Sequence, residues 1–192
     1  MKGKTGKYDI VVLGGSSGGV EALLKIIPNL SPDFTVPFVI VVHQSRSSRS
    51  SLAQVLQSRT KLIVCEPEDK EKILPGHIYI ATPDYHLMIE EDKTFSYAYS
   101  ELVNYSRPSI DVLFETAAEA YGEKLIGVLI TGGNADGAAG LKHIVEKGGL
   151  AIVEDPDTAD TPAMPRAALK MSKVDFVLSI DELIKKLNSL TK

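Results

Sequence analysis

Residues 8–19 read YDIVVLGGSSGG, and residues 20–30 continue as VEALLKIIPNL. The first run is apolar and rich in β-branched side chains, which is typical of a buried strand. The second run has apolar residues at helical spacing. The glycine-rich turn between them therefore connects a strand to a helix, which is the first step of a βαβ unit in a parallel sheet.

The same alternation of short apolar runs and longer amphipathic segments continues along the chain. Several of the runs are apolar on both faces, as strands are when helices cover both sides of a sheet. The expected fold is therefore α/β, with a doubly wound, mostly parallel sheet and helices on both faces. Further strands are predicted at residues 37–42, 61–65, 77–81, 86–90, 125–131, 150–154 and 174–178, and further helices at 50–58, 108–122, 136–149, 162–171 and 179–190.

One edge of the sheet is expected to be antiparallel. Residues 82–85 read TPDY, which is a turn sequence between the strands predicted at 77–81 and 86–90. A turn this short favours antiparallel neighbours, and residues 94–100 form another strand-like run. These three runs therefore predict an edge meander. The irregular stretch at residues 154–162 is the best candidate for a loop at the rim of a site.

Length and composition favour a single globular domain that spans residues 1–192. Apolar residues make up 44% of the chain and charged residues 24%, and the net charge is −4 with no long basic run. This balance disfavours nucleic acid and anionic membrane surfaces as partners. The apolar runs are too short to span a bilayer, the N-terminal residues lack a secretory pattern, and one cysteine allows no intrachain disulfide. We therefore expect a cytoplasmic protein.

Ser16, at the centre of the glycine-rich turn, is the candidate nucleophile. A dinucleotide-binding loop has glycine at the position of Ser16, and a P-loop has lysine where Val20 stands. The turn instead matches G-x-S-x-G, in which a serine projects from a sharp strand-to-helix turn. Free amides at the start of the following helix can then stabilise an oxyanion. The pattern is weak by itself, because glycine-rich turns of this kind are common.

His43 is the candidate base, since histidine titrates near neutral pH and can take a proton from a serine hydroxyl. It follows the strand predicted at 37–42, so it should lie at the same carboxyl edge of the sheet as Ser16. His77 begins a strand and His143 lies within a helix, where structural roles are the simpler interpretation. His86 could line the cleft, although a surface or structural role is favoured.

Asp136 is the candidate acid that orients the base. It follows the strand predicted at 125–131 and another glycine-rich turn, again at the carboxyl edge of the sheet. An aspartate at a helix start is also a common N-cap. Three triad residue types at three such turns nevertheless favour a catalytic triad. The order serine, histidine, aspartate differs from that of the α/β-hydrolase fold, so this would be a convergent triad.

Six segments in order make the chain resemble the catalytic domain of the chemotaxis (CheB-type) protein-glutamate methylesterases. They are GGSSGGVEAL, VVHQ, LPGHIYIATPDYHL, RPSIDVLFETAAEAYG, GVLITGGNADGAAGL and MPRAAL. The resemblance implies a nucleophile at Ser16, a base at His43 and an orienting carboxylate at Asp136. It also implies hydrolysis of glutamyl γ-methyl esters on the cytoplasmic helices of chemoreceptors, and in some members deamidation of glutamine. Such a reaction needs no metal and no organic cofactor.

Other residues are expected to support the same chemistry. The backbone amides of Ser17 and Gly133 are candidate oxyanion donors. Arg107 could hold an acidic substrate surface, or it could be an ordinary surface or structural arginine. Three residues depart from the usual family pattern: Gly133 and Gln44 stand in place of methionines, and Ser17 in place of threonine. Gly133 keeps its amide but removes a side chain from the cleft, and Gln44 makes the lining more polar.

Two alternatives remain open at this point. The chain could be an esterase for another ester, or a weakly active or non-catalytic module that binds receptor-like helices. Family members usually carry an N-terminal phospho-receiver domain, and we expect none within these 192 residues. The expected partners are methylated chemoreceptor helices or a similar protein substrate.

Overall fold

The computed structural model describes residues 7–43 and 52–190. Within these residues, seven strands form one sheet in which every neighbouring pair is parallel. Their order is β3-β4-β2-β1-β7-β8-β9. The bounds are β1 (Ile10–Gly15), β2 (Phe38–Val42), β3 (Ile63–Cys65), β4 (His77–Ile80), β7 (Leu125–Leu129), β8 (Leu150–Glu154) and β9 (Phe176–Leu178).

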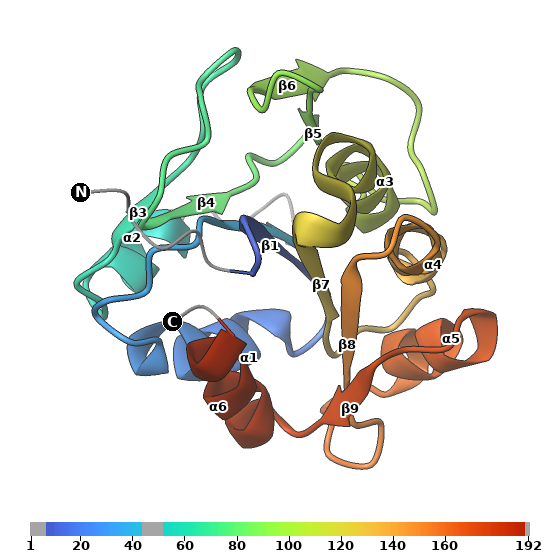
Figure 1. The fold of residues 1–192 in the computed structure, drawn as a ribbon. Helices are drawn as coiled ribbons and strands as arrows, with labels where there is room; N and C mark the ends of the chain where they lie inside the picture. The colour runs from blue at the N-terminus through green and yellow to red at the C-terminus, as the bar shows by residue number, and fades with distance from the viewer. Residues whose placement is uncertain (1–6, 44–51, 191–192) are drawn as a thin grey trace.

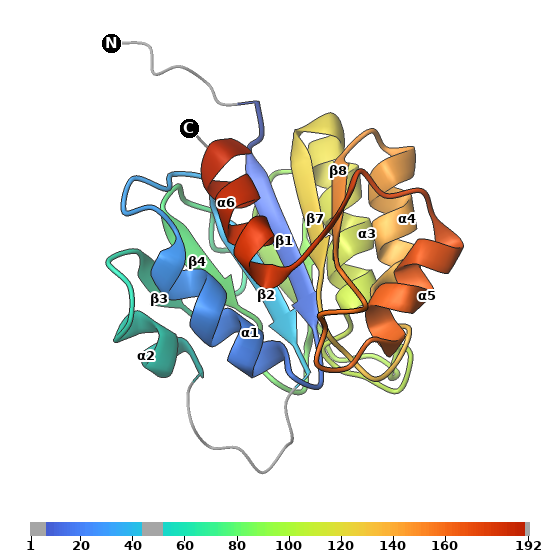
Figure 2. The ribbon, with the colours of Figure 1, turned by 90° about the horizontal axis from the view of Figure 1, so that it is seen from below.

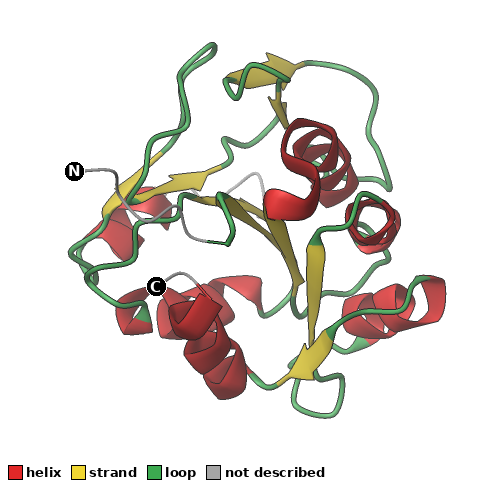
Figure 3. Cartoon of the chain, in the orientation of Figure 1, coloured by secondary structure: helices red, strands yellow, loops and turns green. Residues whose placement is uncertain are grey.

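Helices cover both faces of this sheet (Figure 1). On one face lie α1 (Gly19–Ile26), α2 (Leu52–Gln57) and α6 (Ile180–Leu190). On the other face lie α3 (Ile110–Tyr121), α4 (Ala138–Glu146) and α5 (Ala163–Met171). Short 3-10 turns, η1 (Ile27–Asn29) and η2 (Gly122–Lys124), follow α1 and α3. The same layers are visible by element type in Figure 3.

The central strands are buried on both sides, which explains their uninterrupted apolar sequences. In β1, Val11 and Leu13 point into the core beneath α1 and α6, whereas Ile10 and Val12 point into the core beneath α3 and α4. Successive strand residues face opposite sides of a sheet, so a strand between two helical layers has no polar face. The predicted doubly wound α/β fold is confirmed.

The predicted edge meander is wrong in one detail, the pairing of β4. β4 belongs to the parallel sheet between β3 and β2, and β5 (His86–Ile89) pairs antiparallel with β6 (Phe95–Ala98) as a separate sheet. β4 is apolar on both faces, so it is stabilised inside the main sheet, whereas β5 packs on α3 through a bond from Ile89 N to Thr116 Oγ1 (3.2 Å). The TPDY turn therefore leads the chain out of the sheet toward α3 (Figure 1).

The topology brings three loops to one edge of the sheet. The chain leaves β1 toward β2 on one side, and later adds β7 on the other side of β1. The carboxyl ends of β1, β2 and β7 are therefore neighbours, and ligands of open α/β sheets bind where the strand order reverses in this way. Figure 2 shows β1 and β2 pointing to this edge. The loops that follow these strands carry Ser16, His43 and Asp136.

Candidate active site

Ser16 lies directly after β1, in a turn held by the segment beyond β7 and by the start of α1. Its amide donates to Thr131 O (2.9 Å) beyond β7, and its carbonyl accepts from Gly19 N (2.7 Å) at the start of α1. Gly18 has a φ of 82°, in the left-handed region that glycine adopts without steric cost. The tight turn leaves Ser16 partly exposed beyond the carboxyl end of the strand.

His43 joins the other two predicted residues. It lies one residue beyond β2, where its amide donates to Gly15 O (3.1 Å). Its Nδ1 is 3.2 Å from Ser16 Oγ, and its Nε2 is 2.9 Å from Asp136 Oδ2. The structure therefore brings the three side chains into one hydrogen-bonded chain, with the imidazole in the middle.

Asp136 is buried just before α4, but its carboxylate accepts hydrogen bonds from the N-terminus of α3. The N-cap of α4 is Gly137, which makes no side-chain cap, so the N-cap interpretation of Asp136 does not hold for α4. A helix N-terminus has unpaired amides and favours negative charge. Among the described residues, the donors to its carboxylate are His43 Nε2 and Ile110 N (2.7 Å) at Oδ2, and Ser109 Oγ (2.8 Å), Asn104 Nδ2 (3.2 Å) and Asp111 N (3.2 Å) at Oδ1.

These donors determine the protonation states of Asp136 and His43. Burial acts to raise the pKa of Asp136, but the hydrogen bonds from His43, Ile110 and their neighbours outweigh it and hold the pKa below its usual value. Asp136 is therefore a carboxylate at neutral pH and can only accept. His43 must then carry its hydrogen on Nε2, which leaves the Nδ1 lone pair to accept the proton of Ser16.

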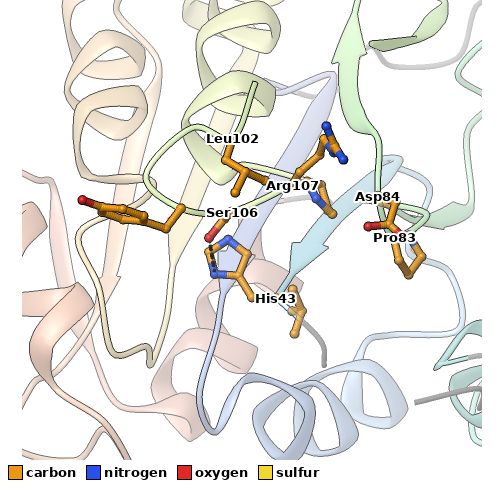
Figure 4. Close-up of a pocket in the computed structure, with 10 residues that line it drawn as sticks. His43, Pro83, Asp84, Leu102, Ser106 and Arg107 are labelled. Atoms are coloured by element: carbon orange, nitrogen blue, oxygen red, sulfur yellow. Dashed lines mark hydrogen bonds between the residues drawn. The ribbon is translucent and has the colours of Figure 1, made fainter. Parts of the chain in front are cut away.

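A pocket of about 190 Å³ opens beside His43. Ser106 Oγ lies 3.4 Å from His43 Nδ1, so a second hydroxyl faces the same ring nitrogen from the pocket side (Figure 4). The pocket is formed by the end of β2, the segment after β4 and the loop that precedes α3. Its lining residues are Val42, His43, Ala81, Pro83, Asp84, Leu102, Tyr105, Ser106, Arg107 and Pro108.

Arg107 lines this pocket, as its proposed contact with substrate requires. Its guanidinium lies over the Tyr99 ring at 4.0 Å from the centroid, and Nη1 donates to Ser100 O (2.6 Å). Its Nε is buried and has no hydrogen-bond partner among the described residues. The side chain is thus held beside the pocket by packing on Tyr99 and by one carbonyl acceptor.

The two predicted oxyanion loops lie side by side. Thr131 Oγ1 donates to Ser17 O (2.9 Å), and Ser17 Oγ would lie 3.6 Å from a Cβ placed on Gly133. Within residues 7–43 and 52–190, neither the Ser17 amide nor the Gly133 amide donates a hydrogen bond. The loop predicted at 154–162 does form a rim here, since Gly132 N donates to Thr161 O (2.9 Å). Gln44 lies outside the described residues.

Comparison with known proteins identifies the family. The model described as CheB methylesterase matches residues 11–187. The chain belongs to the CheB methylesterase family. A relative from Leptospira interrogans serovar copenhageni is named putative protein-glutamate methylesterase/protein-glutamine glutaminase. It is 50% identical over 176 residues, which cover 92% of this chain and 91% of the relative.

Some CheB relatives are longer and match this chain over about half of their own length. The protein-glutamate methylesterase/protein-glutamine glutaminase of Thermotoga maritima is 38% identical over 184 residues, which cover 94% of this chain and 54% of the relative. The crystal structure of the Thermotoga maritima CheB methylesterase catalytic domain matches with a TM-score of 0.90 and 37% identity. It covers 97% of this chain and 100% of the domain, so the CheB catalytic fold accounts for nearly the whole chain.

The site contains residues that sequence reasoning about this CheB chain missed. Asn104, Ser106, Ser109 and Asp111 all take part in the hydrogen bonds around His43 and Asp136. Ser109 was within reach of prediction, because a serine immediately before an apolar helical run is an N-cap signal. Asn104 and Ser106 belong to the loop before α3, which has no periodic pattern, and Asp111 lies in the first turn of the predicted helix, where its contact depends on the tertiary fold.

The other histidines of this CheB family member have partners of their own. His86 is buried, where Nδ1 accepts from Ser109 N (3.1 Å) and Nε2 donates to Glu101 O (3.0 Å), so it supports the start of α3. His77 bonds to Pro75 O (2.9 Å), and His143 pairs with Glu119 (2.7 Å) on the surface. These contacts agree with the structural roles expected for all three.

The described residues provide neither a grouped set of metal ligands nor a membrane-spanning helix. Among them, no three histidine, cysteine, aspartate or glutamate side chains are grouped so as to hold a metal ion. No helix in the part of the chain that the structure describes is long and apolar enough to cross a bilayer.

Proposed function

We propose that this chain is a protein-glutamate methylesterase in which Ser16 is the nucleophile, His43 the base and Asp136 the orienting acid. The observation that carries the proposal is the continuous chain from Ser16 Oγ through both ring nitrogens of His43 to Asp136 Oδ2, at 3.2 Å and 2.9 Å. An alcohol, an imidazole and a buried carboxylate in this order are the groups that acyl transfer needs. The names of the relatives support the same reaction class.

The reaction would run in two stages. Ser16 Oγ attacks the γ-carbonyl carbon of the ester while His43 Nδ1 takes the hydroxyl proton. The tetrahedral intermediate then expels the methoxy group, which leaves as methanol with the proton from Nδ1, and an acyl-enzyme remains on Ser16. Water then attacks the acyl carbon while Nδ1 takes its proton, and Nδ1 returns that proton to the departing Ser16 Oγ as glutamate is released. Asp136 stays ionised throughout and stabilises the imidazolium at each proton transfer.

The supporting groups are assigned by their positions. The unengaged amides of Ser17 and Gly133 flank the serine turn and would bind the developing oxyanion. Arg107, at the rim of the pocket beside His43, would hold an acidic group near the ester. The first contact would use the two backbone amides as donors, and the second would use the guanidinium group of Arg107.

The proposed substrates are methylated helices of chemoreceptors or a similar protein, reached in the cytoplasm by residues 1–192 acting as one catalytic domain. The relatives are named for glutamate esters and for protein glutamine. A glutamine side chain would give the same acyl-enzyme, with ammonia leaving in place of methanol. Deamidation is therefore proposed as a second activity of the same three residues.

Methanol release from a methylated chemoreceptor fragment tests this function. Ser16→Ala should lower the rate by at least about three orders of magnitude, because the acyl-enzyme cannot form. Ser189→Ala, an exposed serine on α6, is the matched control and should keep the wild-type rate.

Two further outcomes separate the alternatives. Hydrolysis of a small activated ester that depends on Ser16, without methanol release from the receptor, would indicate an esterase for another substrate. Binding of receptor fragments with no hydrolysis of either substrate would indicate a non-catalytic module.

A further inference from the structure

Asn104 links the acid of the triad to a second buried carboxyl group. Its Nδ2 donates to Asp136 Oδ1 (3.2 Å) and to Asp111 Oδ2 (2.7 Å), so both amide hydrogens are used. Asn104 itself is an exposed residue of the loop before α3, with a φ of 48°. A non-glycine residue in the left-handed region is uncommon, although asparagine tolerates it better than most. The loop is thus held in a conformation that aims this amide inward.

The orientation of the amide is fixed by charge. If the group rotated by 180°, its carbonyl oxygen would face the carboxyl oxygens of Asp111 and Asp136, which only accept hydrogen bonds when ionised. Asp111 is in turn held from α4, because its Oδ1 accepts from Gly140 N (2.7 Å). A rigid helix therefore holds Asp111, Asp111 holds Asn104, and Asn104 holds Asp136.

We propose that Asn104 is a positioning residue for the reaction, which acts by holding Asp136 Oδ1 so that Oδ2 stays directed at His43. The inference rests on the proposed triad. The remaining donors to Asp136 Oδ1, Ser109 Oγ and Asp111 N, both come from the first turn of α3. Asn104 donates from the loop outside the helix, so it holds Oδ1 through a second segment of the chain and ties that oxygen to Asp111.

The charged and titratable groups around Asn104 determine how a substitution of this residue affects Asp136. Asp111 and Asp136 face its amide directly, and His43 lies beyond Asp136. Glu115, one turn further along α3, raises the pKa of Asp111, and His86 from β5 meets the start of the helix at Ser109 N. A carboxylate in place of the Asn104 amide would add a third acid to two that already share one site.

Two substitutions at this position make the test. Asn104→Ala removes the donor, and we expect kcat to fall roughly tenfold with little change in KM, because the residue does not line the pocket. Asn104→Asp has nearly the same shape, yet we expect a larger loss at pH 8, where its charge repels both neighbours. The loss should shrink as the pH is lowered and the new carboxyl group protonates and can donate. Both effects should appear with a small activated ester and with a methylated protein.

Asn188→Ala is the matched control. Asn188 also ties two segments together, through Ser31 N (2.8 Å) and Asn29 O (2.9 Å), but on the α6 side of the molecule. It should leave kcat and the pH profile unchanged. If Asn104→Ala and Asn104→Asp lower kcat equally at every pH, or not at all, while Ser16→Ala is inactive, the positioning role is overturned and the triad stands. If Ser16→Ala is fully active, the triad itself fails.

Discussion

Asp136 and Asp111 are two acids of one site whose pKa values move in opposite directions. Burial is opposed at Asp136 by charge-assisted hydrogen bonds, and its pKa is lowered. At Asp111, burial is the largest cause, the Asp136 charge adds to it, and the pKa is raised to about 6. When two carboxyl groups share one buried site, the charge of one commonly raises the pKa of the other. The group that contacts His43 is the one that stays ionised.

The raised pKa of Asp111 predicts a pH-dependent stability. The unfolded chain ionises this group near 3.8, so between that value and about 6 the native state binds more protons. The stability that Asp111 contributes is therefore present at low pH and is lost as the pH rises through about 6. Unfolding of wild type and Asp111→Asn by denaturant from pH 4 to pH 8 measures this. The stability of wild type relative to the variant should fall on the order of 1–3 kcal/mol over that range, and a constant difference would contradict it.

Gly133 offers a stabilising substitution. Its φ lies outside the left-handed region, and an added Cβ would meet Ser17 Oγ at 3.6 Å and Thr161 Cγ2 at 3.9 Å, which are ordinary contacts. Alanine reduces the freedom of the unfolded chain at no steric cost here, so Gly133→Ala should raise the free energy of unfolding by about 0.4–1 kcal/mol. Denaturant titration measures the change. A destabilised variant would mean that the loop is strained at this residue.

At the residue scale, the sequence predicts the three side chains that the fold brings together, but not the loop residue that contacts one of them. Ser16, His43 and Asp136 each follow a predicted strand, so the topology of a parallel sheet placed them together. Asn104 could not be found in this way, because its role depends on a left-handed backbone in a loop of no regular pattern.

At the scale of elements, the N-terminus of α3 is the part of the fold that completes the site. Ser109 caps this helix by accepting from Val112 N (3.5 Å), and its hydroxyl donates to Asp136 Oδ1. One serine therefore serves both the helix and the carboxylate.

Ser109→Ala should consequently affect both properties. We expect the free energy of unfolding to fall by about 1–3 kcal/mol, from the lost cap and the lost donor, and kcat to fall with it. Ser179, at the start of α6, bonds to Glu182 Oε2 (2.7 Å) and is the control, since Ser179→Ala should lower stability without changing kcat. Wild-type kcat in Ser109→Ala would show that the hydroxyl does not support Asp136.

The elements themselves were largely predictable, and the exception has a physical cause. Strand and helix patterns are set by burial, which a period of two or of 3.6 residues records in the sequence. The strands that pair with β4 are determined by the tertiary fold. They depend on residues that are distant in the sequence. The local turn therefore predicts a meander, whereas β4 pairs with its parallel neighbours β2 and β3.

At the scale of the whole molecule, one sheet separates two apolar cores. Leu23 of α1 and Leu113 of α3 are fully buried on opposite sides of it. Because both cores depend on the same strands, the molecule should unfold as one cooperative unit.

Leu23→Ala and Leu113→Ala test whether the two cores unfold cooperatively. Each should lower the free energy of unfolding by about 2–5 kcal/mol through the cavity that it leaves, and both should move the same single transition in a thermal melt. Two separate transitions, of which each variant moves one, would show that the two layers are independent.

The central claim is that Ser16 is a nucleophile activated by His43, and covalent labelling tests it most directly. The protein is treated with a fluorophosphonate, which bonds to an activated serine oxygen as fluoride leaves, and the adduct is located by peptide mass mapping. We predict one adduct on Ser16, formed at least a hundredfold more slowly in His43→Ala, in line with the rate that a catalytic base supplies. An adduct on another serine, or equal labelling of Ser16 in wild type and His43→Ala, would contradict the account.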